Sequence, residues 1–153
     1  ALSITDGAAD ILVIDTSTAG NVLTITGAVL GNLTITSSGA TAGIGYAAGA
    51  GGTVTQITNK ATGVTLDKIT GIITMNNASL AADTTVAFVL TNSAIAATDA
   101  VIVLHESAGT IGAYSFGSTA AAGTATISVH NNTPGALGEA IVLRFVVIKS
   151  VNA

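Results

Sequence analysis

The chain has 153 residues, enough for one domain of ordinary size with an extended arm, but not for two full domains. Only 8% of the residues are charged, against roughly 25% in a typical soluble protein, and 49% are hydrophobic. This composition excludes charge-rich disorder, and four basic side chains are too few for a nucleic-acid surface, so we expect no nucleic-acid partner. The absence of cysteine excludes disulfides and thiolate metal sites.

Residue types that form strands dominate the sequence. Ile, Val and Thr contribute 54 of the 153 residues, and their branched side chains fit a pleated sheet better than a helix. No window of about 18 residues is continuously apolar, so we predict no membrane-spanning helix and no membrane partner. The opening residues 1–6 lack the basic start and apolar run of a signal peptide, and we expect none.

The first 40 residues predict a β-rich N-terminal arm. Short apolar strand patterns at 11–14, 21–27 and 32–36 are separated by Gly and Asn. In 23–26 and 33–36, Leu and Ile alternate with Thr, which places the apolar side chains on one face. Such an arm cannot close a core alone, so we expect it to pack on other chains. We assign its assembly interface to Leu2, Ile4, Ile11, Val13, Leu23, Ile25, Leu33 and Ile35.

A glycine-rich stretch follows the arm, and we interpret residues 41–52 as a linker. The alternative is a dinucleotide-binding loop at 43–49. That segment is one residue out of register with the G-x-G-x-x-G pattern, and no helical pattern follows it, so we favour the linker.

Residues 53–153 predict a sandwich domain. Turn-forming residues separate eight strand patterns, and no helical pattern of useful length lies between them. Helix, if present, is confined to 78–82 or 94–97. The regular spacing predicts an all-β, antiparallel β-sandwich, jelly-roll-like, preceded by the extended arm. The predicted strands are 53–58, 63–66, 71–75, 84–91, 100–105, 112–116, 123–130 and 140–149.

Two sets of side chains raise the possibility of a metal site. His105, Glu106 and His130 lie near predicted strand ends and could converge on a metal or an acid–base site. Asp6, Asp10 and Asp15 recur in the arm, but they lack the spacing and glycine of an EF-hand loop. We favour local hydrogen bonding and solvated turns for both sets, and expect no metal or cofactor.

Signals for catalysis are weak. The segment 116–120 lacks the second glycine of a nucleophile elbow. Four carboxylates could supply a glycosidase pair, so a hydrolase acting on cell-surface polysaccharide stays open as an alternative. The chain has no Trp and only two Tyr for stacking on sugars, so we expect no enzyme. The four carboxylates are Asp83, Asp99, Glu106 and Glu139.

Residues 45–149 carry a series of segments that resembles a known structural domain. The segments are Gly45-Tyr46, residues 49–56, 62–68, 71–76, 90–93, 95–99 and 112–114, and the C-terminal Phe145-Val146-Val147-Ile148-Lys149. They resemble a domain found in structural proteins of tailed bacteriophages and prophages, among them small decoration (cement) proteins and fibre-like accessory proteins. The resemblance implies a virion component, and it transfers no functional residue.

The resemblance and the predicted arm together lead to one expectation and one alternative. We expect a homotrimeric capsid decoration protein on the outer capsid surface, where the arm contacts neighbouring copies or the major capsid protein and stabilises the shell. The alternative is a head or tail fibre protein with a trimeric shaft and a host-recognition head. Copy number on the particle separates the two.

Overall fold

A computed structural model describes residues 45–46 and 48–151 of the chain, so the arm of residues 1–40 and its assigned interface lie outside the described residues. The described part contains eight strands and no helix, which confirms the all-β prediction. Each predicted strand is present, although the bounds differ. The strands are β1 (Thr53–Thr55), β2 (Val64–Thr65), β3 (Thr70–Thr74), β4 (Thr85–Thr91), β5 (Ala100–Ser107), β6 (Tyr114–Ala121), β7 (Thr124–Asn131) and β8 (Val142–Ile148).

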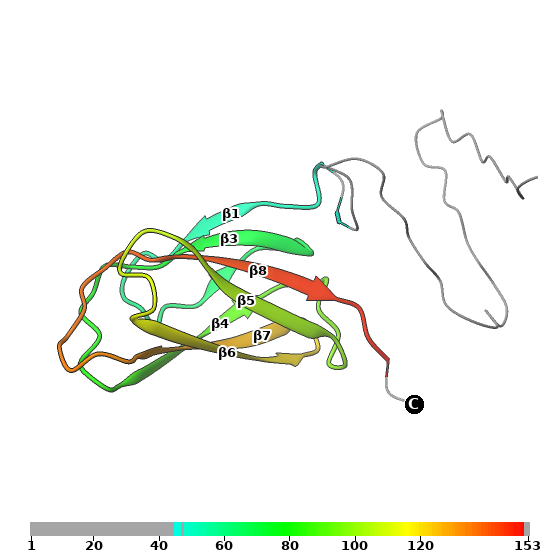
Figure 1. Cartoon of the computed structure of the whole chain (residues 1–153). Helices are drawn as coiled ribbons and strands as arrows, with labels where there is room; N and C mark the ends of the chain where they lie inside the picture. Colours follow the sequence, from blue (N-terminus) through cyan, green and yellow to red (C-terminus); the bar gives the residue numbers. More distant parts are fainter. Residues whose placement is uncertain (1–44, 47, 152–153) are drawn as a thin grey trace, which may run out of the picture. The chain divides into compact units, whose positions relative to one another are not determined.

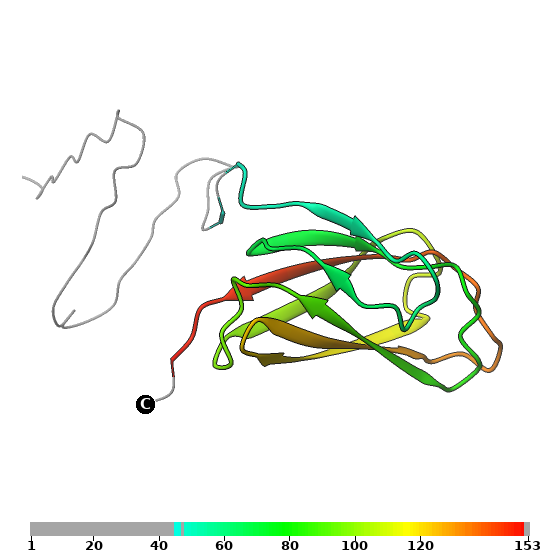
Figure 2. The same cartoon turned by 180° about the vertical axis from the view of Figure 1, so that it is seen from behind.

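The strands form two four-stranded sheets that pack face to face (Figures 1 and 2). Sheet A has the order β1-β3-β8-β5, and sheet B has the order β2-β4-β7-β6. Every connection crosses from one sheet to the other except the β6–β7 hairpin. Two edge pairs, β1 with β3 and β2 with β4, are parallel, because the strand between each pair in the sequence belongs to the opposite sheet. The other pairs are antiparallel.

The core lies between the sheets and is mainly aliphatic. Alternate residues of β7 and β8 point inward, and Ile127, Val129, Leu143 and Phe145 are fully buried. The Phe145 ring needs the space left by Gly71, its pairing partner in β3, because a Cβ there would lie 2.7 Å from Cε1 of the ring.

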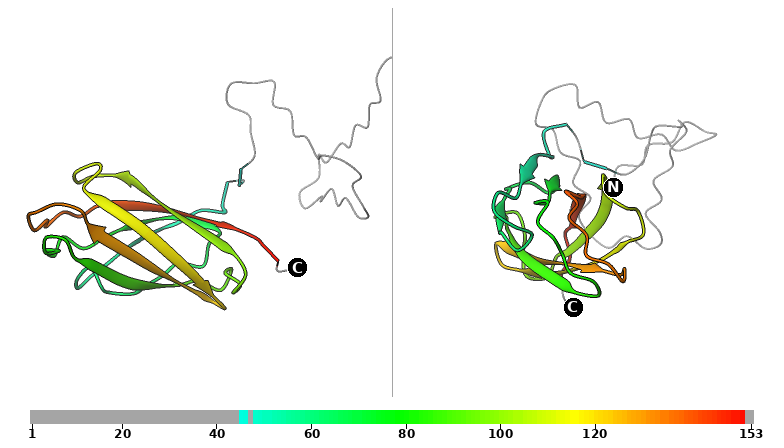
Figure 3. Two further views of the ribbon diagram at one scale, coloured as in Figure 1. Left: turned by 60° about the horizontal axis from the view of Figure 1, so that its bottom comes forward. Right: turned by 90° about the vertical axis from the view of Figure 1, so that its left-hand side faces the viewer.

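The connections gather at the two ends of the sandwich. The loops after β1, β3, β5 and β7 lie at one end, which we call the four-loop end. The β6–β7 turn and the C-terminal residues after β8 lie at the other, as the left view of Figure 3 also shows. Neither 78–82 nor 94–97 is helical; both belong to loops.

Candidate functional site

All nine charged side chains of the described part contact another group of the same chain. Arg144 donates to the Glu106 carboxylate through Nε at 2.7 Å and Nη2 at 2.5 Å. This bidentate ion pair lies on the outside of sheet A. This guanidinium lowers the pKa of the Glu106 carboxyl. Lys149 donates from Nζ to Oδ2 of the buried Asp99 at 2.5 Å. The Ala96 N–H, followed by Lys149, lowers the pKa of Asp99.

The buried Lys60 connects loops at the four-loop end. Its side chain comes from the loop after β1, and its Nζ donates to the carbonyls of Asn76, at 2.7 Å, and Glu139, at 2.5 Å. The Glu139 carboxylate in turn accepts from the Thr110 hydroxyl at 2.6 Å and from the Tyr114 hydroxyl at 2.8 Å. One polar network therefore ties together the four loops at this end.

The pKa values in this network follow its geometry. Burial lowers the pKa of Lys60, and the negative charge of Glu139 partly opposes that effect. Hydrogen bonds from the hydroxyl and the N–H of Thr110, and then from Tyr114, lower the pKa of Glu139. Burial and the bond to Glu139 raise the pKa of Tyr114. The two shifts favour the charged form of Glu139 and the neutral form of Tyr114, which are the forms that the hydrogen bond between them uses.

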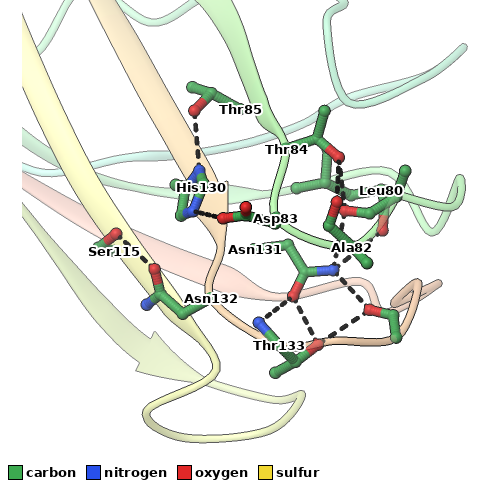
Figure 4. A network of polar contacts seen from close by, with 12 residues as sticks. Leu80, Ala82, Asp83, Thr84, Thr85, Ser115, His130, Asn131, Asn132 and Thr133 are labelled. Atoms are coloured by element: carbon green, nitrogen blue, oxygen red, sulfur yellow. Dashed lines mark hydrogen bonds and ion pairs between the residues drawn. The ribbon is translucent and has the colours of Figure 1, made fainter.

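A second polar network surrounds Asn131 (Figure 4). Its buried amide nitrogen donates to the carbonyls of Leu80, Ala81 and Gly135, and its Oδ1 accepts from the Thr133 N–H at 3.0 Å. The side chain thereby satisfies backbone groups of the loops that follow β3 and β7. Its role is to fix these loops.

The two histidines are not brought together. His105 is half-buried on β5, with Nε2 2.6 Å from the Ala108 carbonyl and its ring 6.0 Å from that of Phe116. His130 lies on β7, with Nδ1 2.9 Å from the Thr85 hydroxyl and Nε2 3.3 Å from Asp83 (Figure 4). No cluster of three possible metal ligands occurs in the described ranges, and Asp6, Asp10 and Asp15 lie outside them.

The four carboxylates considered for glycoside hydrolysis also have separate partners. Asp99 lies after β4 and Glu139 after β7, at opposite ends of the sandwich. Glu106 is paired with Arg144 on the outside of sheet A, and Asp83 contacts His130 beside sheet B. Among the described residues, each of these four carboxylates therefore has its own partner within the chain. A shallow depression lined by His105, Glu106, Ser107 and Ile111 places only one carboxylate beside it.

The outer side of sheet A carries an unusual surface, which we call the aliphatic face. It consists of Ile72, Ile102, Leu104, Val146 and Ile148. Ile102 lies opposite Val146 in the ladder between β5 and β8, so the side chains are neighbours. Leu104 is 53% exposed and Ile148 is 48% exposed. The Arg144–Glu106 pair is the charged feature among these side chains.

The sequence contains a signal for the aliphatic face that our strand assignment did not use. The runs 100–104 and 145–148 are apolar at consecutive positions, which is typical of a strand covered on both faces. In the sandwich only alternate residues, such as Val101 and Val147, are covered by sheet B.

The outer side of sheet B differs in character and carries mainly hydroxyl and small side chains. Thr119 lies opposite Thr126, and Thr124 lies opposite Thr91, so threonines are neighbours across three strands. The two sheets therefore present one aliphatic and one hydroxylated surface.

No family model, curated protein or solved structure matches this chain. Among the described residues no helix has the length and apolar character needed to cross a bilayer.

Proposed function

We propose that the chain is a structural protein that works inside an assembly, and specifically a component of a virion. The observation that carries this proposal is the aliphatic face: apart from the Glu106–Arg144 pair, β5 and β8 carry mainly apolar side chains on both sides, and the described part of the chain covers only the inner side. Exposed apolar surface of this kind is typical of a protein interface. Its burial in an assembly would be favourable because it removes aliphatic groups from water.

The arrangement of charges supports the same proposal. Arg144, Lys149 and Lys60 are all engaged within the chain, so few cations are left to attract an acidic partner. Association by apolar burial and shape therefore fits the described surface better than association by ion pairing.

In its finer form, the proposal is a capsid decoration protein that binds as a homotrimer on the outer capsid surface and stabilises the shell. The resemblance to phage structural domains supports this form, and the alternating Leu/Ile pattern of the arm supports contacts with neighbouring copies and with the major capsid protein. The protein would act mechanically, through many modest contacts, and without catalysis or a cofactor.

The proposal is tested by binding to purified particles that lack the protein. Replacing Ile25→Asp together with Ile35→Asp places charges on the apolar side of the arm, and we expect particle binding to be lost while the sandwich stays folded. Undiminished binding would show that the arm does not carry the interface.

A second pair of variants tests the aliphatic face. Ile102→Asp with Leu104→Asp changes exposed positions on sheet A, and we expect weaker particle binding. Ala87→Asp with Val89→Asp is the matched control, because these positions are also two residues apart on one strand and are exposed on the opposite sheet. Equal loss in both pairs would point to general destabilisation and would count against a specific role for the aliphatic face.

A fibre protein is the second candidate, because the same resemblance includes fibre-like accessory proteins. Labelling the protein on intact particles separates the two functions. Many copies over the shell support decoration, whereas a few copies at the tail or at isolated points on the head support a fibre.

A further inference from the structure

The free edge of β6 is the least protected of the four sheet edges in the described part. Proteins limit unwanted strand pairing by short edge strands, charges and bulges. β1 and β2 have only three and two residues, and β5 has an irregularity between His105 and Ser107 with the charged Glu106 inside it. β6 has eight residues, pairs in continuous register with β7, and contains no charge and no proline.

The hydrogen-bond pattern shows which backbone groups of β6 face outward. Asn132 donates its N–H to the Ala113 carbonyl, just beyond the pair of Tyr114 and Asn131. In an antiparallel ladder such a bond flanks a pair that is not itself hydrogen-bonded, and the two kinds of pair alternate. Phe116, Ser118 and Ala120 therefore direct their N–H and C=O groups away from β7.

β5 of the neighbouring sheet lies close beside β6 but is not paired with it. No backbone hydrogen bond joins β5 to β6 in the part of the chain that is described. The Ser118 hydroxyl donates to the Val101 carbonyl of β5, and this contact uses the side chain, so the Ser118 N–H stays available. The small side chains of Gly117, Ser118 and Ala120 leave room for another strand.

We propose that the β6 edge pairs antiparallel with β6 of a second copy, around a two-fold axis at Ser118. In this register Phe116 of each copy lies opposite Ala120 of the other, so a large inward side chain meets a small one. Gly117 lies opposite Thr119 on the outer side, and no like charges meet. The outward groups of Phe116, Ser118 and Ala120 exchange about six backbone hydrogen bonds.

A two-fold partner fits this edge because its outward-facing backbone groups are arranged symmetrically about Ser118. An isologous contact requires each residue to accept its counterpart in the same patch. Phe116 and Ala120 are equally distant from Ser118 in sequence and have the same orientation relative to β7. The joined sheets would form one continuous eight-stranded sheet, in the order β2-β4-β7-β6 and its reverse.

The two-fold contact deepens the proposed function, although the pairing itself does not rest on a virion role. Three-fold contacts through the arm and two-fold contacts through β6 would together generate a two-dimensional net, which a shell covering needs. A single strand pair is a small contact and therefore weak in solution. On a shell, the fixed positions of neighbouring trimers raise the effective concentration.

The experiment uses the full chain with Ser118→Pro and its matched control Ser118→Ala. Both variants lose the bond to Val101, but only proline also removes the outward N–H and blocks a neighbouring strand. We expect sedimentation equilibrium to show a concentration-dependent doubling of mass in the natural sequence and in Ser118→Ala, and its loss in Ser118→Pro. Circular dichroism checks that both variants are folded.

Amide exchange in the natural sequence supplies a test that needs no substitution. We expect the amides of Phe116, Ser118 and Ala120 to become protected as the protein concentration rises, while those of Gly117 and Thr119 stay protected throughout by β7. Rapid exchange of the first three at every concentration, or a mass doubling that survives in Ser118→Pro, overturns the pairing.

Two further outcomes would also overturn it. If Ser118→Ala abolishes the doubling as fully as proline does, the side-chain bond is responsible and not the strand edge. If the three amides are protected in a monomer, the chain itself covers the edge. None of these outcomes bears on particle binding by the arm, so failure of the pairing is distinguishable from failure of the proposed function.

Discussion

Lys60 shows how a single buried side chain can organise a whole end of this sandwich. It is 3% exposed, and its ammonium group is the donor shared by the Asn76 and Glu139 carbonyls. Buried carbonyls that lose a donor carry the full penalty of desolvation. The need of these carbonyls for a donor therefore explains why Lys60 is buried in a chain with so few charged residues.

Replacing Lys60→Met keeps an unbranched apolar side chain of four heavy atoms and removes the ammonium donor. We expect the free energy of unfolding to fall by about 1–3 kcal/mol, because two part-buried carbonyls lose a charged donor. Urea denaturation measures the change. Lys68→Met is the control, since the exposed Lys68 ammonium donates to the Gly49 carbonyl alone among the described residues, and a change within about 0.5 kcal/mol is expected there. Similar effects in both variants would contradict a special role for Lys60.

Glu139 predicts how stability depends on pH. Its pKa in the folded chain lies below its ordinary value of 4.5, because Thr110 and Tyr114 donate to the carboxylate. A carboxyl group with a lowered folded pKa stabilises the fold above the unfolded pKa, and this contribution disappears as the pH falls through the folded pKa. We expect Glu139→Gln to be less stable at pH 7 and to lose less stability on acidification below about pH 4.5.

The measurement is urea unfolding of both chains over a series of pH values. Asp83→Asn is the control, because the Asp83 side chain is 92% exposed and asparagine tolerates its positive φ of 49°. An acid response in Glu139→Gln identical to that of the natural sequence would show that other carboxyl groups carry the pH dependence. Asp67, Asp99 and Glu106 also have lowered pKa values, so part of the acid sensitivity is expected to remain.

At the scale of the elements, β3 and β8 are fitted to one another through Gly71 and Phe145. A Cβ on Gly71 would lie 2.6 Å from a Leu66 methyl group and 2.7 Å from the Phe145 ring, closer than real contacts allow. We expect Gly71→Ala to destabilise the chain by about 1–3 kcal/mol, as overpacking of a core does. Thermal unfolding measures this, with Gly135→Ala as the control because its Cβ would meet open space. Equal melting temperatures for the two variants would contradict the close packing at Gly71.

The sequence predicted the existence of the strands well, because alternation and turn residues are local signals. It predicted β6 poorly: the strand was expected to end at Phe116 but continues to Ala121. Gly117, Ser118 and Ala120 have low strand propensity, and their conformation follows from pairing with β7, which no local pattern reveals. The parallel edge pairs were missed for a related reason. Turn residues mark where the chain reverses, but not which sheet the next strand joins.

At the scale of the whole molecule, the sequence showed that charged residues are few, but it did not show which groups each charged side chain contacts. Lys60 lies 79 residues from Glu139 in sequence, and Arg144 lies 38 residues from Glu106. Such partners depend on the fold and cannot be read from spacing. His105 and His130 do not meet, because His105 faces inward towards Phe116 of sheet B whereas His130 lies on the outer side of β7. The aliphatic face, in contrast, was encoded in consecutive apolar residues of two strands.

The internal pairing of charges predicts how any assembly of this protein responds to salt. Ionic contacts between chains weaken as salt screens them, with a Debye length of about 3 Å at 1 M ionic strength. Apolar contacts are instead strengthened by sulfate, which is excluded from protein surfaces. Because Arg144, Lys149 and Lys60 are engaged within the chain, we expect self-association to change little with sodium chloride and to increase with ammonium sulfate. Sedimentation velocity in matched series of the two salts measures the response, with viscosity and density corrected. Dissociation by sodium chloride alone would instead identify ion pairing between copies as the main contact and would contradict an apolar interface.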